Sequence, residues 1–198
     1  MTFLRVRAAS ALALCGLAAW SAPTAAEVAS YELDPNHTTV AFMVDHLGYA
    51  KVLGMFRAAR GSYDFDEASG TLGKVRIEVD TQSVFSNYAK RDQHLKSADF
   101  LNTAQFPRMV FTAEGGRRTG ERSYEIAGQL ELLGRLQPMT LNATWNKSGP
   151  SPVDKVYTMG VSARGSFKRS GHGMNYGVAN QWVGDEVPLL IEFEAQRK

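Results

Sequence analysis

"KVRIEVD", Lys74 to Asp80, alternates apolar and charged residues from end to end. Val75, Ile77 and Val79 share one parity, and the charged side chains hold the other. Successive side chains of a strand point to opposite faces, so the pattern predicts a strand with one buried face and one wet face. Strands of this kind are typical of antiparallel sheets.

The same alternation recurs along the chain. It is present in "YEIAGQLEL" (124–132), "MTLNATW" (139–145), "YTMGVSA" (157–163) and "VPLLIEFEA" (187–195), and turn signals such as "EASG" (67–70) separate the segments. We predict about eight strands, with an additional short one at 30–33: 38–46, 51–65, 73–81, 108–115, 122–133, 138–147, 155–168 and 186–195. Many strands joined by short turns favour a sandwich or a closed barrel.

One segment with helical character interrupts the strands. It is "KRDQHLKSADF", Lys90 to Phe100, within the long connection between the strands that end near 81 and begin at 108. Ser86 or Asn87 can cap the start of a helix, and Pro107 closes the connection. The apolar edge is narrow, so we predict a short helix that covers one end of a barrel and turns its charges to solvent or to the rim.

The first 26 residues differ from the rest. Arg5 and Arg7 precede an almost wholly apolar or small stretch, Ala8 to Trp20, and small residues lead up to Glu27. This order predicts a secretory signal peptide over 1–26 whose apolar part is too short for a good membrane span. Its removal leaves residues 27–198 as one domain, large enough to form a core without disulfides.

The only cysteine, Cys15, lies inside this leader. Leu14 precedes it at a position where a lipoprotein signal has a small residue, which argues against lipidation. Without Arg5 and Arg7, Lys plus Arg falls from 22 to 20, against 20 Asp plus Glu. A chain of such balanced charge gives no indication of a nucleic-acid surface.

The four histidines do not indicate a metal site. His37, His46, His94 and His172 form no HxH or HExxH pair. His46 shares parity with Val44 and therefore belongs to the apolar face of its strand. Two interpretations of it stay open: a buried histidine bonded to a backbone carbonyl, or a polar group that holds the head of a ligand inside a pocket.

The sequence offers no catalytic group with a recognisable setting. It contains no GxSxG elbow, and the paired carboxylates Glu192 and Glu194 belong to a solvated face. The interior of a small barrel is either filled by its own side chains or holds one small ligand, and both use the same inward pattern.

Five segments in order carry a family resemblance: "YELDPNHTTVAFMVDHLGYAKVLGMF" (31–56), "RDQHLKSADFLNTAQFP" (91–107), "GQLELLG" (128–134), "FKRSGHGMN" (167–175) and "VGDEVPLLIEFEA" (183–195). Together they resemble the YceI family of periplasmic, lipocalin-like proteins over essentially all of 27–198. The resemblance implies an all-β fold, an antiparallel eight-stranded lipocalin-like barrel with a short helical insertion at its mouth. It also implies an elongated cavity that holds an apolar chain.

Family members are associated with polyisoprenoids, including isoprenoid quinones, so the resemblance implies a periplasmic lipid-binding or carrier protein with no cofactor other than the bound lipid or quinone. The family's recurring polar positions match His37, His46, Arg91, Asp92 and His94; we expect His46 to touch the ligand and place the other four at the mouth or in structural roles. This chain departs from the family where "RSGHGM" (169–174) replaces the frequent "RSDFGM", and where Ala59 replaces a bulky apolar residue.

Parity and the resembling segments together give the residues expected to touch the ligand: Phe42, Val44, His46, Phe56, Leu95, Phe100, Met139, Leu141, Trp145, Met159, Val161, Ala163 and Ile191. The expected partner is a long-chain apolar lipid. Transient contact with a membrane or a membrane redox protein, and a homodimer, are compatible with this interpretation. The alternatives are an enzyme that modifies a lipid with His46 or His94 as base, and a filled barrel that serves as an interaction module.

Overall fold

The computed structural model describes residues 27–198. The predicted signal peptide, with Cys15, lies outside the described residues. The elements in chain order are β1 (Ala29–His46), β2 (Ala50–Phe56), β3 (Ala59–Asp66), β4 (Thr71–Asp80), η1 (Thr81–Ser83), β5 (Val84–Phe85), α1 (Ala89–Lys96), β6 (Arg108–Gly115), β7 (Arg117–Arg118), β8 (Ser123–Leu132), β9 (Arg135–Pro150), β10 (Tyr157–Lys168), η2 (Arg169–His172) and β11 (Glu186–Arg197).

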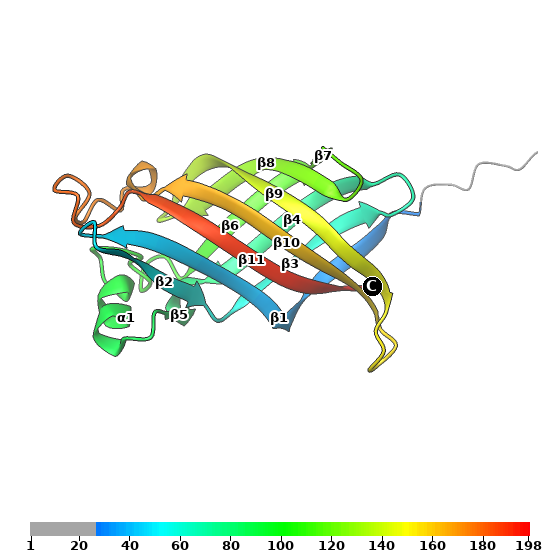
Figure 1. The fold of residues 1–198 in the computed structure, drawn as a ribbon, viewed down its shortest axis with the longest axis horizontal. Helices are drawn as coiled ribbons and strands as arrows, with labels where there is room; N and C mark the ends of the chain where they lie inside the picture. The colour runs from blue at the N-terminus through cyan, green and yellow to red at the C-terminus, as the bar shows by residue number, and fades with distance from the viewer. Residues whose placement is uncertain (1–26) are drawn as a thin grey trace, which may run out of the picture.

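The strands form one closed antiparallel barrel (Figure 1). Neighbours run β11, β10, β9, β8, β6, β4, β3 and β1, and the pairing of β1 with β11 closes the ring of eight strands. Val40 of β1 lies opposite Ile191 of β11 at this seam. Closure leaves no unpaired edge in the ring. The predicted eight-stranded barrel with one short helix is therefore confirmed.

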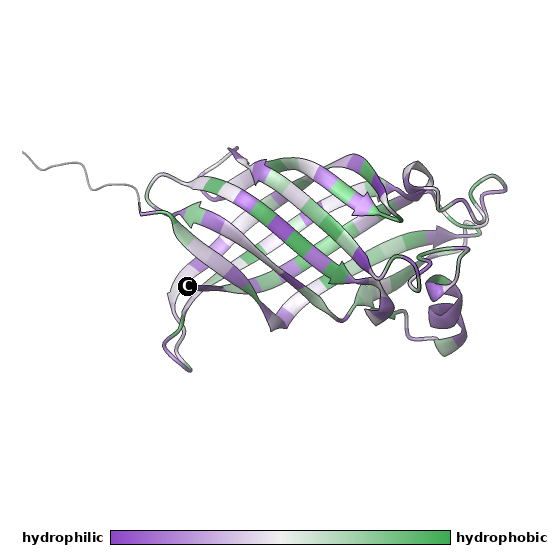
Figure 2. Cartoon of the chain, turned by 180° about the vertical axis from the view of Figure 1, so that it is seen from behind, coloured by the Kyte–Doolittle hydropathy of each residue, from purple (hydrophilic) through white to green (hydrophobic). Residues whose placement is uncertain are grey.

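The period-two pattern sets the inside and the outside of the wall. In β4, Val75 and Val79 are buried, and Arg76 between them is exposed. Figure 2 shows the same alternation of apolar and polar residues along the strands. The inward parity therefore lines the lumen with apolar side chains from every strand of the ring.

The predicted single strand at 51–65 is wrong in one respect, because it is interrupted at Arg57 and Ala58. Both halves pair with β1: His46 lies opposite Ala50 of β2, and Glu32 lies opposite Ser62 of β3. On their other side the halves have different neighbours, since β2 pairs with β5 and β3 with β4. The sheet divides at this point, and β2 extends past the ring toward α1.

The predicted short strand at 30–33 and the strand at 38–46 are one element, β1. The register against β11 shifts between Leu33 and Thr38, so the intervening residues form a bulge. Pro35 lies in that bulge, where the proline's missing N–H costs no ladder hydrogen bond. The polar "DPNH" segment interrupts the pattern in the sequence without ending the strand.

One end of the barrel collects the irregular elements. The β1–β2 turn, α1 and the segment from η2 to β11 all lie at this end, on the left of Figure 1. We call it the mouth. The helix prediction is correct in place but wrong about its cap: Tyr88 is the N-cap residue, without a side-chain bond. Ser86 bonds Asp92 instead, and Asn87 adopts a positive φ of 62°.

Candidate ligand cavity

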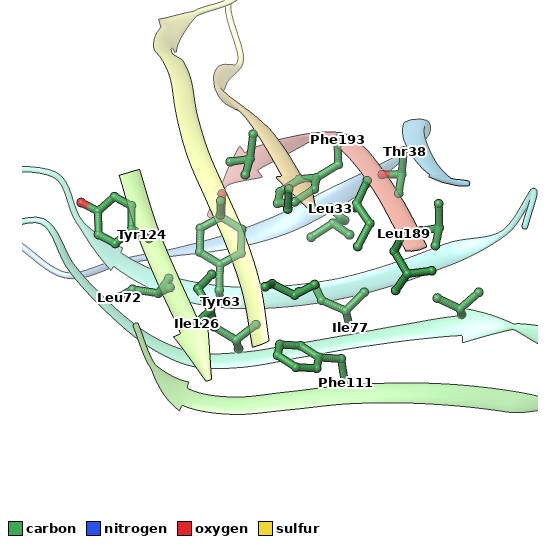
Figure 3. A pocket seen from close by; sticks show the side chains of 18 of the residues that line it. Leu33, Thr38, Tyr63, Leu72, Ile77, Phe111, Tyr124, Ile126, Leu189 and Phe193 are labelled. Atoms are coloured by element: carbon green, nitrogen blue, oxygen red, sulfur yellow. The ribbon is translucent and has the colours of Figure 1, made fainter. Parts of the chain in front are cut away.

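The barrel encloses an apolar cavity that we call the inner tunnel, with a volume of about 110 Å³. Figure 3 shows side chains from separate strands converging on it. Every strand of the ring contributes to its lining: Leu33, Thr38 and Val40; Tyr63 and Phe65; Leu72, Val75, Ile77 and Val79; Met109 and Phe111; Tyr124, Ile126 and Leu130; Met139, Leu141, Ala143 and Trp145; Met159, Val161 and Ala163; and Leu189, Ile191 and Phe193.

A second cavity of about 520 Å³ lies at the mouth, and we call it the outer chamber. Its floor is apolar, with Phe42, Phe56 and Leu132 among its lining residues. Charged and imidazole side chains add polarity to its walls: Asp45, His46, Lys90, Arg91, His94 and Arg169. The volume falls within the range of roughly 300–1,000 Å³ typical of small-molecule sites. Met109 and Leu189 line both cavities, so the two adjoin there.

All thirteen residues expected to touch a ligand line one of these two cavities. Seven line the inner tunnel: Met139, Leu141, Trp145, Met159, Val161, Ala163 and Ile191. Six line the outer chamber: Phe42, Val44, His46, Phe56, Leu95 and Phe100. Arg91 and His94 also line the chamber, whereas Asp92 and His37 do not.

The interpretation of His46 as a buried residue is wrong. His46 is exposed at the last position of β1. Its side chain belongs to the inward face and lines the chamber. The barrel wall ends at this residue, so solvent reaches the imidazole. Its position is that of a polar group at the rim of a pocket.

His37 lies away from the mouth and lines neither cavity. Its ring Nδ1 is 2.9 Å from Asp34 Oδ2, and its side chain is 61% exposed on the outer face of the β1 bulge. The carboxylates of Asp34 and, at 4.0 Å, Glu194 surround it. The bond to Asp34 raises the pKa of His37 and lowers the pKa of Asp34.

Arg91 and Asp92 are adjacent on α1, yet both bond Ser86, a buried residue in the segment that follows β5. Ser86 donates its backbone N–H to Asp92 Oδ1 at 2.8 Å, and its hydroxyl donates to the same oxygen. Arg91 Nε donates to the Ser86 hydroxyl oxygen at 2.7 Å, and its Nη2 donates to the Ser86 carbonyl. The pair therefore anchors α1 to the barrel wall through one serine.

His94 stands on the face of α1 that borders the chamber. Its Nε2 is 2.8 Å from Asp99 Oδ2, and its ring lies edge-on to Phe100 and Tyr176 at 4.9 Å and 5.0 Å between centroids. Aromatic pairs favour this T-shaped arrangement. His94 thus joins α1 to the segment that follows η2.

Arg169 is the main chamber residue that the sequence reading missed. It is 1% exposed and donates to four backbone carbonyls, those of Gly184, Met174, Tyr176 and Val183, at 2.7–2.8 Å. Burial lowers the pKa of its guanidinium, which still carries its charge at neutral pH. The bonds hold the 173–184 segment against η2 and place a cation beside the cavity.

His172, the residue at which the chain departs from the family motif, is also buried, with 1% exposure. Its Nδ1 is 3.0 Å from the Arg135 carbonyl, and its Nε2 is buried without a hydrogen-bond partner. The Nδ1 therefore carries the proton. Burial lowers the pKa of His172, and the hydrogen bonds to the backbone of Arg135 and Leu132 oppose this effect only in part. The ring packs edge-on against Phe167, a chamber-lining residue.

The far end of the barrel is closed by aromatic side chains. Tyr31 and Tyr63 stack with centroids 5.3 Å apart, and Phe65 meets Tyr124 and Trp145 edge-on. Glu67, in the β3–β4 turn, accepts hydrogen bonds from Tyr31 at 2.6 Å and from two further hydroxyls. Burial and the bond to Glu67 raise the pKa of the Tyr31 hydroxyl.

Within residues 27–198 no group of three or more His, Cys, Asp or Glu side chains is placed to hold a metal ion. Over the same residues, none of the helices has the length and apolar character needed to cross a membrane.

Comparison with known proteins gives the family. A profile of the YceI-like domain matches residues 31–195. The chain belongs to the YceI-like family. It is 38% identical over 175 residues to a UPF0312 protein of Shewanella baltica, covering 86% of this chain and 90% of that protein. It is 36% identical to protein YceI of Escherichia coli over 173 residues, covering 85% and 87% of the two chains.

Solved structures share the barrel of this YceI-like protein. The YceI protein of Campylobacter jejuni matches with a TM-score of 0.70 at 27% identity, covering 78% of this chain and 90% of that chain. BcnA of Burkholderia cenocepacia gives 0.72 at 19% identity, with 82% and 98% covered. A polyisoprenoid binding domain from Saccharophagus degradans gives 0.61 at 14% identity, with 87% and 100% covered. The last two similarities show the fold.

Proposed function

We propose that this protein binds one long-chain isoprenoid lipid, a polyisoprenoid or an isoprenoid quinone, with the chain in the inner tunnel and the polar head in the outer chamber. The observation that carries the proposal is the pair of adjoining cavities: an almost wholly apolar tunnel, and toward the mouth a chamber whose apolar lining includes charged and imidazole side chains. An amphiphile with a long apolar tail and one polar head matches this order.

The tail would supply most of the affinity. Burial of each CH₂ group contributes about 0.8 kcal/mol, so an apolar tunnel binds long chains strongly and distinguishes poorly between them. The tunnel of about 110 Å³ holds only a few methylene groups, so in this proposal the flexible side chains of Met139 and Met159 move aside to admit a longer chain. Selectivity would then come from the chamber, where His46, Arg91 and His94 offer hydrogen bonds to a head group.

The family and one structural neighbour support a binding role. The Saccharophagus degradans domain is named for polyisoprenoid binding, and its barrel resembles this one. In this proposal the protein is a carrier or a sequestering protein and not an enzyme. The leader predicted from residues 1–26 would deliver it to the periplasm, where a water-insoluble lipid needs a protein to cross the aqueous space.

Intrinsic fluorescence offers a direct binding test, because Trp145 lines the tunnel and Trp182 lies outside both cavities. In delipidated protein of residues 27–198 that carries Trp182→Phe, all tryptophan fluorescence comes from Trp145. Added isoprenoid quinone should change the emission of Trp145 saturably, because its tail would pack against this side chain in the tunnel while the quinone head stays in the chamber. The matched variant Trp145→Phe should respond weakly. Equal response of both variants, or none from Trp145, would contradict a tunnel-bound chain.

A further inference from the structure

The exposed large apolar side chains are concentrated at one end of the molecule. Within residues 27–198, Tyr49, Tyr88, Tyr176 and Trp182 are the exposed aromatic residues, and all four lie at the mouth. Tyr49 is 90% exposed and Trp182 is 55% exposed. At the far end of the barrel, the exposed apolar side chains among the described residues are two valines, Val28 and Val153.

These aromatic residues belong to one continuous rim, which we define as Leu47, Tyr49, Tyr88, Tyr176 and Trp182. The Leu47 backbone N–H donates to the Trp182 carbonyl at 2.9 Å, which joins the β1–β2 turn to the segment before β11. The Tyr176 ring contacts His94 of α1, and Tyr88 is the N-cap of that helix. The three segments surround the outer chamber at the same end of the barrel (Figure 1).

The apolar surface continues from the rim onto the outer wall. Met43 of β1 lies opposite Leu53 of β2 in the ladder, so their side chains share the outward face. Met43 is 38% exposed and Leu53 is 59% exposed. Contiguous exposed apolar surface on a soluble domain marks a contact with a partner protein or a membrane.

Charges of both signs flank the rim: Lys51 and Lys90 are cations, and Asp45, opposite Lys51 in the ladder, is an anion. Lys51 follows Tyr49 closely and Lys90 follows Tyr88, and within residues 27–198 neither lysine forms an ion pair. The carboxylate of Asp99, on the same side, is already bonded to His94. Tyrosine and tryptophan place an apolar ring and a polar tip at the level of lipid head groups, and neighbouring lysines are attracted to anionic lipids. This combination fits a bilayer better than the flat apolar face of a protein partner.

We propose that the rim docks the protein on the interface of an anionic lipid bilayer, with the outer chamber facing the membrane. The proposal builds on the lipid-binding function argued above and adds the surface through which the lipid arrives. In that orientation an apolar chain passes from the bilayer into the chamber and then into the tunnel without being exposed to water. The far end, with Glu67 and its hydroxyl partners, faces away from the membrane.

The test uses residues 27–198, which contain the whole closed barrel, and vesicles of phosphatidylcholine alone or mixed with phosphatidylglycerol. Flotation should recover the wild-type protein with the mixed vesicles, less at high salt because counter-ions screen the lysines. The double variant Tyr49→Ser, Trp182→Ser should lose roughly tenfold or more in vesicle affinity, since each removes a large apolar contact. Lys51→Gln should weaken binding only to the anionic vesicles.

Val153→Ser is the matched control, because Val153 is 91% exposed at the far end. It should bind vesicles like the wild type. Tyr49, Trp182 and Lys51 do not line the chamber, so the response of Trp145 to the quinone's tail should survive in these variants. Loss of vesicle binding with a retained Trp145 response supports the docking surface.

Three results would overturn the proposal. The first is a wild-type protein that takes up quinone but floats with neither kind of vesicle, and the second is a double variant that floats like the wild type. The third is a wild-type protein that is a dimer in solution while the double variant is a monomer. The last would show that a second copy covers the rim. Absence of quinone uptake with intact vesicle binding would contradict the proposed function and leave the docking surface in place.

Discussion

Met109 on β6 and Leu189 on β11 line both the inner tunnel and the outer chamber, and both are buried, at 4% and 5% exposure. The two side chains therefore lie at the boundary between the tunnel, proposed for the tail, and the chamber, proposed for the head. A short ligand that stays in the chamber contacts only chamber residues. A ligand long enough to pass Met109 and Leu189 also contacts the apolar lining of the tunnel.

Blocking the tunnel should separate tail binding from folding. Ala163 lies opposite Ala143 in the ladder and lines the tunnel. The large side chain of Ala163→Trp should therefore fill the space that these two alanines leave in the tunnel. We expect it to abolish retention of long-chain lipid at purification. Ala127→Trp, on an exposed outward position of β8, is the control and should retain lipid.

The readout is lipid content by mass spectrometry, with the circular dichroism spectrum and the unfolding midpoint measured alongside. Overpacking costs roughly 1–3 kcal/mol in a filled core, so a folded Ala163→Trp protein is expected. An Ala163→Trp protein that unfolds, together with a wild type that never carries lipid, would show that the lumen is a filled core.

The Ser86 anchor should contribute measurable stability. Asp92→Ala removes the acceptor of both Ser86 hydrogen bonds and should lower the free energy of unfolding by about 2 kcal/mol, because hydrogen bonds to charged groups contribute roughly 1.5–3 kcal/mol. Asp92→Asn keeps an acceptor oxygen and should lose less. Urea denaturation measures both. Equal stability of Asp92→Ala and wild type would contradict a structural role.

Removal of Arg169 should loosen the mouth. Arg169→Met leaves four carbonyls without their donor, and we expect the free energy of unfolding to fall by a few kcal/mol, since a buried acceptor left unsatisfied costs roughly 1–3 kcal/mol. Amide exchange should quicken over residues 173–184 more than in the barrel strands. Arg169→Lys, which keeps the charge but has fewer donors, should be intermediate. Uniform loss of protection across all strands would indicate global destabilisation instead.

His172 should make stability depend on pH. Burial lowers its pKa in the folded protein below the ordinary value of 6.5. As the pH falls through 6.5, the unfolded chain binds a proton that the folded protein refuses, so stability is full above 6.5 and declines below it until the folded pKa is reached. His172→Phe should flatten this decline, measured as urea midpoints on either side of pH 6.5. If the urea midpoint of His172→Phe declined below pH 6.5 as steeply as that of the wild type, a group other than His172 would be responsible.

The wall of the barrel could be predicted from the sequence because the signal is local. Alternation in Lys74–Asp80 fixes which residues face inward, and the same parity correctly placed Met139 and Ala163 in the lumen. The break at Arg57 and Ala58 was missed because it depends on which strands pair on the far side, β5 for one half and β4 for the other. Such pairing leaves no trace in the alternation itself.

The chamber was only partly predictable for a similar reason. Residues on β1 and α1 follow a period, whereas Arg169 and Tyr176 lie in irregular backbone held by carbonyls distant in sequence. In the sequence Arg169 resembles an ordinary surface charge. The one signal that could have found it is its place before two glycines, Gly171 and Gly173, because Gly173 takes a positive φ of 86° and folds the chain back over the arginine.

The measurement that tests the central claim most directly is mass spectrometry of an organic extract from the wild-type protein, purified without detergent from cells that export it. The account predicts a long-chain isoprenoid lipid at close to one molecule per protein chain, lost when Ala163 is replaced by Trp. An extract without lipid, from a folded protein that also takes up none when isoprenoid lipid is added, would contradict it.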